Sequence, residues 1–145
     1  MTPSVREVLQ GCAITFAAPP PADAGPEFGA SRRGIATMLI MLAAEEAERE
    51  AGAAIVENAA IRALFDRAGA YDAALAGRLK AAAAAKDESL TIPALEAANA
   101  DLRRLLIELH SRIEEAGDVA LDAEILALYV AMAHGRRLSL PRGGA

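Results

Sequence analysis

The sequence predicts an all-α fold: a bundle of four to five helices with one long helix (about 31–68) and no sheet. Apolar residues recur every three or four positions over most of the chain, which is the spacing of amphipathic helices. No segment alternates with a period of two over a useful length, so no strand is expected. Short turns separate the helical segments, and amphipathic helices joined in this way bury their apolar stripes by forming a bundle.

The first helix is expected from about Ser4 to about Phe16. Thr2-Pro3-Ser4 is a typical helix start, and five apolar residues follow at helical spacing: Val5, Val8, Leu9, Cys12 and Phe16. Cys12 lies within this stripe, so it is expected to be buried and unbridged. Half of the residues in 18–29 are proline or glycine, and this stretch is predicted to be a loop.

The long helix is expected to begin near Ala30 or Ser31 and to extend to about Ala68. Its first third is apolar on all sides, which indicates burial against more than one neighbour. Gly52 lies in its interior and is a possible kink, so the sequence leaves the continuity of this helix open.

Three further helices are predicted, from about Tyr71 to Lys86, from Pro93 to about Ala116, and from about Leu121 to Ala133. The turn at 117–118 separates the last two. The final helix is apolar over most of its circumference, which indicates a central position in the bundle or a subunit contact. Residues 135–145 are expected to form a flexible basic tail, and residues 1–145 one domain.

Composition narrows the possible partners and compartments. The formal charge of -5 and the pI near 5.1 argue against a nucleic-acid or anionic-membrane partner, because those partners require a basic face. A single cysteine fits a reducing cytoplasm, and the start of the chain lacks the features of a signal peptide. Aromatic residues make up only 3%, so closely packed helices are favoured over a roomy ligand cavity. The chain carries no cofactor signature, and no cofactor is expected.

The only two asparagines, Asn58 and Asn99, each open a similar eight-residue pattern within a predicted helix. Asparagine is a poor helix former, so a local contact is expected to compensate for each one. Arg62 and Arg103 follow one turn later on the same face. We therefore predict a structural polar seam in which Asn58 and Asn99 lie at the same level on facing helices and are at least partly buried.

Two groups of residues are candidates for chemistry. Glu46, Glu50 and Glu57 lie on one side of the long helix, and inward glutamates of a bundle can hold metal ions. The chain has no Glu-x-x-His, which such sites normally include, so a solvated charged face is the favoured interpretation. Salt bridges to another helix are the remaining alternative. His110 and Glu114 are one turn apart and are candidates for a general base, although a boundary hydrogen bond explains the pair equally well.

Three segments carry a resemblance to a known group of proteins: 6–9, 57–65 and 99–110. Together they resemble a family of small all-α bacterial proteins without assigned function. Members of this family are often encoded near acyl-CoA dehydrogenases and aminoglycoside-phosphotransferase-like kinases. The resemblance covers most of the chain from Val5 to about Tyr129, and it implies an accessory role in acyl-group metabolism.

Three hypotheses about function follow. The first is a cytoplasmic, non-enzymatic accessory or protein-interaction module that self-associates, most simply as a dimer, through its long or its last helix. The second is a binding protein for a small apolar ligand such as an acyl chain, held between the long helix and the last two and suggested by Met38, Met41 and Met132. The third is a metal-dependent enzyme that uses the glutamates of the long helix.

Overall fold

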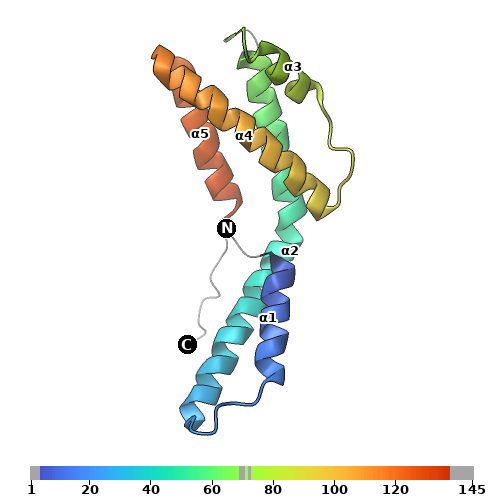
Figure 1. Ribbon diagram of the computed structural model, residues 1–145, viewed down its shortest axis with the longest axis vertical. Helices are drawn as coiled ribbons and strands as arrows, with labels where there is room; N and C mark the ends of the chain where they lie inside the picture. Colours follow the sequence, from blue (N-terminus) through green and yellow to red (C-terminus); the bar gives the residue numbers. More distant parts are fainter. Residues whose placement is uncertain (1–3, 69–70, 72, 138–145) are drawn as a thin grey trace. The chain divides into compact units, whose positions relative to one another are not determined.

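A computed structural model describes residues 4–68, 71 and 73–137 of the chain. Over these residues it contains helices only, as the sequence predicts. They are α1 (Val5–Ala17), α2 (Pro26–Ala68), α3 (Ala76–Ala84), α4 (Ile92–Ala116) and α5 (Val119–Gly135), and Figure 1 shows them in chain order. Within the described part of the chain, none of these helices is long and apolar enough to cross a membrane.

The chain groups into two compact units, although the sequence predicts one domain. The N-terminal unit contains the described residues up to Arg49, and the C-terminal unit runs from Glu50 to Arg137. Helix α2 is assigned without a break through Gly52, and it contributes residues to both units.

In the N-terminal unit, α1 and the first part of α2 form an antiparallel helical hairpin (Figure 1). Ser4 caps α1: its hydroxyl accepts from the backbone N–H of Glu7, whose carboxylate accepts from the N–H of Ser4. The thiol of Cys12 contacts the carbonyl oxygen of Ala36 at 3.8 Å, and the cysteine is buried and free, which confirms its prediction.

The loop between α1 and α2 is shorter than the predicted 18–29. It ends at Gly25, whose carbonyl accepts from the N–H of Phe28 at 3.0 Å. The long helix was expected to begin near residue 30, and this expectation was wrong by about one turn. Proline is favoured at the first position of a helix, where its missing N–H is not needed, so Pro26 begins the helix rather than excluding it.

In the C-terminal unit, the end of α2 packs with α3, α4 and α5 around a core of leucine, isoleucine and phenylalanine. Fully buried members come from all four helices: Ile61, Phe65, Leu79, Leu106, Leu109, Ile113 and Ile125. Helices α4 and α5 form a hairpin at Gly117, which adopts the left-handed conformation with φ 71°. Helix α5 begins at Val119, earlier than predicted, because Asp118 accepts from the N–H of Leu121 and caps it.

Helix α3 is shorter than the predicted 71–86 helix. Its N-terminal turn has no capping side chain, and the described residues before it form turns. At its other end Ala85 is extended, with ψ 150°, and the chain leaves the helix there. Because the helix ends early, Asp87 reaches a contact with α2. A longer α3 would place Asp87 elsewhere.

Candidate functional site

The two asparagines meet in the buried interior of the C-terminal unit. The side-chain amide of Asn99 on α4 donates to Oδ1 of Asn58 on α2 at 2.9 Å. It also donates to Oε1 of Glu57 at 3.1 Å. Asn58 is 0% exposed and Asn99 4% exposed, so the predicted contact between facing helices is present and fully buried. The amides obtain here the hydrogen bonds that two helix interiors do not provide.

Glu57 is the charge at the centre of this network, and it is only 5% exposed. Nε of Arg136 donates to Oε2 of Glu57 at 2.8 Å, and Nη2 of the same guanidinium donates to Oδ1 of Asn99 at 3.3 Å. Arg103 lies at 3.7 Å from Oε1 of Glu57 and remains about half exposed. A buried carboxylate is costly unless it is paired and hydrogen-bonded, and these contacts meet both conditions.

The contact to Glu57 corrects the prediction for the end of the chain. A flexible tail was expected from residue 135 onward, but Gly135 is the last residue of α5 and Arg136 contacts α2 and α4. The buried charge of Glu57 explains why Arg136 is held there. Residues 138–145 of the predicted tail lie outside the described residues.

A second ion pair flanks the asparagines. Nη2 of Arg62 lies 2.6 Å from Oδ1 of Asp87, and both side chains are nearly buried. The amide of Asn58 donates to the same oxygen at 3.3 Å and to the carbonyl of Leu95 at 3.4 Å. The hydrogen bond from Arg62, with that of Asn58, lowers the pKa of Asp87 against the opposing effect of burial. Arg62 thus ties α2 to the segment after α3.

His110 lies between α4 and α5. Its Nε2 is 2.9 Å from Oδ1 of Asp122 and 3.9 Å from Oε1 of Glu114, and its ring meets the edge of Tyr129 at 5.5 Å. Burial raises the pKa of Tyr129, while the charge of Arg103 opposes that rise. Imidazole and carboxylates are donors that Zn²⁺ accepts, and these three ligand atoms lie within 4.8 Å of one another. The hydrogen bond between His110 and Asp122 joins α4 to α5 and closes the hairpin.

The glutamates of α2 do not form the carboxylate site that was considered. Glu50 and Glu57 are both in the C-terminal unit, and seven residues of helix separate them by about 10 Å, too far for one ion. Glu57 is buried and paired with two arginines, so the favoured interpretation of a solvated charged face was wrong for this residue, which forms salt bridges to other helices. Glu46 belongs to the N-terminal unit and is partly exposed.

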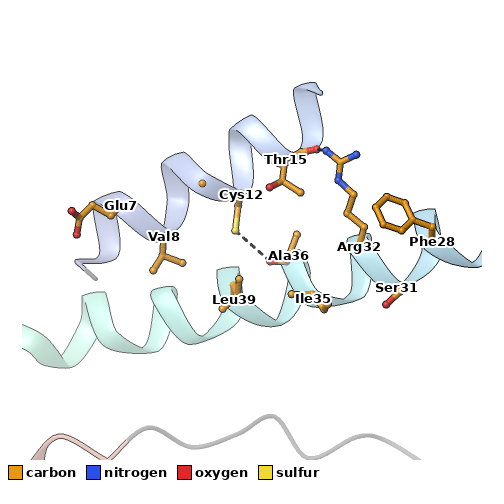
Figure 2. Close-up of a pocket in the computed structure, with 11 residues that line it drawn as sticks. Glu7, Val8, Cys12, Thr15, Phe28, Ser31, Arg32, Ile35, Ala36 and Leu39 are labelled. Carbon is orange, nitrogen blue, oxygen red and sulfur yellow. Dashed lines mark hydrogen bonds between the residues drawn. The ribbon is translucent and has the colours of Figure 1, made fainter. Parts of the chain in front are cut away.

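An apolar groove runs between α1 and α2 in the N-terminal unit, and Figure 2 shows its two walls. Its volume is about 600 Å³. Val8, Gly11 and Cys12 line the α1 wall. On the α2 wall, Phe28, Ile35 and Leu39 are more than one third exposed. The sequence suggested a ligand site between the long helix and the last two helices, whereas this groove lies between the first two.

Three important polar residues were not identified from the sequence: Asp87, Asp122 and Arg136. The contact of Asp122 could have been predicted from residue spacing. Asp122 lies about as far after the Gly117 turn as His110 lies before it, and a helical hairpin brings such residues together. Asp87 and Arg136 lie beyond helix ends, where periodicity carries no signal.

No family model, curated protein or solved structure matches this chain. In the polar network the charged groups pair with one another and hold the helices together. In the groove, by contrast, large apolar side chains remain uncovered.

Replacement of Arg136 by methionine should destabilise the protein by about 3 kcal/mol, because the buried carboxylate of Glu57 loses its closest counter-charge. Urea unfolding followed by circular dichroism measures this change. Arg112→Met is the matched control: Arg112 is an exposed arginine of α4, and its loss should change stability by less than about 0.5 kcal/mol. Equal effects of the two variants would contradict the role assigned to Arg136.

Stability should fall in acid partly through Asp87. Its pKa is lowered in the folded state, so its contribution is present above the unfolded value of about 3.9 and is lost as pH falls through the folded value. Asp87→Asn should cost about 2 kcal/mol at pH 7, and this difference should shrink in urea titrations as pH drops below about 4. Asp66→Asn, at an exposed position of α2, should show neither effect. A deficit of Asp87→Asn that stays constant down to pH 2 would refute this linkage.

Proposed function

We propose that this chain is a non-enzymatic accessory protein of the bacterial cytoplasm that acts by binding another protein chain, in the first place a second copy of itself. The observation that carries this proposal is that the N-terminal unit buries small residues and exposes large apolar ones. Among its described residues, the buried ones are all small: Cys12, Ala36 and Ala43. Nine large apolar residues are more than one third exposed, whereas Leu42 is partly buried: Leu9, Ile14, Phe16, Phe28, Ile35, Met38, Leu39, Ile40 and Met41.

The C-terminal unit provides the contrast. There a core shared by four helices contains fully buried leucine, isoleucine and phenylalanine side chains, although Leu90, Ile107 and Leu126 remain exposed. A two-helix hairpin has no equivalent interior, because each helix covers only one side of the other. A large apolar surface that is exposed to water marks an interaction site, because binding a partner removes that surface from water and lowers the free energy.

The class of partner follows from charge and from the resemblance. A net charge of -5 disfavours nucleic acid and anionic membrane, so protein is the better partner. The resemblance to bacterial proteins encoded near acyl-CoA dehydrogenases supports an accessory role in acyl-group metabolism.

A second candidate function is binding of a small apolar ligand such as an acyl chain. The α1–α2 groove favours it, because its volume of about 600 Å³ is in the range of ligand sites and most of its lining is apolar. Met38 and Met41 are exposed on α2 in the same unit, whereas Met132 is part of the core of the C-terminal unit. Native mass spectrometry of the purified protein tests this alternative, since a bound acyl chain adds a fixed mass to the monomer.

Sedimentation velocity from about 1 to 100 μM tests the proposal, because that range covers the micromolar affinities typical of modest interfaces. We expect a concentration-dependent shift from monomer to dimer at near-physiological salt, driven by burial of the hairpin surface. A monomer at all concentrations would remove self-association from the proposed function. A monomer that carries an acyl mass would support the second candidate instead.

A further inference from the structure

We infer that a second copy of this chain docks on the N-terminal unit with its α2 antiparallel to the first, about a two-fold axis between Met38 and Leu39. This inference rests on the proposed self-association and specifies its geometry. It makes the α1–α2 groove half of an interface between two hairpins, which together form a four-helix bundle.

The first support is a strip along α2 with the spacing of a coiled-coil seam. Its positions alternate in steps of three and four residues: Phe28, Ser31, Ile35, Met38, Leu42, Glu45 and Arg49. Ile35 and Met38 are 54% and 41% exposed, so the centre of the strip is apolar and uncovered. Phe28, Ser31 and Ile35 also line the groove, so the strip borders it.

The second support is the set of contacts that a reversed second copy of this strip would make. About an axis between Met38 and Leu39, Ile35 faces Leu42 of the other copy, which joins two aliphatic side chains. At the ends, Phe28 faces Arg49, and an aromatic face attracts a guanidinium. A parallel pair in register would instead place Glu45 against Glu45 and Arg49 against Arg49, and like charges in contact disfavour it.

The third support is the shape of the hairpin beside the strip. Gly11 faces the groove, and a Cβ built on it would meet nothing within 4 Å. Figure 2 shows Val8 pointing from α1 toward α2, with Ile35 and Leu39 on the facing helix. A neighbouring helix needs such a recess for its side chains, because packed helices insert ridges into grooves.

A second copy accounts for more of the surface than a ligand does. A chain in the groove would cover Phe28, Ile35 and Leu39 but would leave Met38, which lies outside the lining. Pairing of two α2 segments covers Met38 as well as the residues that line the groove. The pairing is also closed, since a two-fold axis uses the same patch on both copies and leaves none for further addition.

Disulfide trapping tests the antiparallel arrangement in a Cys12→Ala background. Ile35→Cys and Leu42→Cys proteins, mixed and oxidised, should form the mixed 35–42 dimer in at least tenfold excess over either homodimer. In the antiparallel pair the two copies of residue 35 lie about 10 Å apart along the axis, beyond disulfide reach. Homodimers in equal or greater yield would overturn the geometry.

Charge substitution tests the position of the surface. Ile35→Glu should weaken dimerisation by about a hundredfold or more, because symmetry places two carboxylates in an apolar interface. Ile14→Glu is the matched control: Ile14 is 69% exposed on α1 and lies outside the groove lining, so its variant should dimerise as the parent does. Both variants should keep the parent's circular dichroism spectrum, since both sites are exposed.

The outcomes separate this inference from the proposed function. A dimer that Ile35→Glu leaves intact would overturn the surface named here while self-association stands. A parent protein that stays monomeric at 100 μM would overturn both. Loss of an acyl mass from a monomeric parent on Ile35→Glu substitution would assign the groove to a ligand and reject the second copy.

Discussion

The C-terminal unit depends on a buried carboxylate that three helices must satisfy together. Glu57 lies on α2, and its oxygens take hydrogen bonds or ion pairs from Asn99 and Arg103 on α4 and from Arg136 at the end of α5. Apolar packing tolerates small shifts of one helix along another, whereas a hydrogen bond at about 3 Å does not. A buried polar contact therefore selects one register among several that the leucine-rich core alone would allow.

The two units differ in how they remove apolar side chains from water. In the C-terminal unit, four helices surround a common interior and polar contacts fix their register. In the N-terminal unit, two helices meet through alanine and cysteine, which allows close approach but leaves the larger side chains outside. The exposed surface of the hairpin is a consequence of having too few helices, and a second chain supplies the missing ones in our account.

Helix content and the asparagine contact were predictable because both follow from periodicity. Spacing placed the apolar stripes, and counting helical rises placed Asn58 level with Asn99. Helix ends were less predictable, since Pro26 was interpreted as a breaker and α3 as two turns longer than it is. Arg136 was missed for a different reason: its partner Glu57 is 79 residues away in the sequence, and no local pattern connects them.

The most direct test of the central claim is a double-mutant cycle on Asn58→Ala and Asn99→Ala, with free energies of unfolding measured in urea. A buried amide pair that fixes the α2–α4 register should give a coupling energy of about 1 kcal/mol or more between the two sites. The double variant would then lose less stability than the two single variants together, because the first substitution already breaks the shared bond. Effects that add to within about 0.3 kcal/mol would show that the contact does not hold the two helices in register.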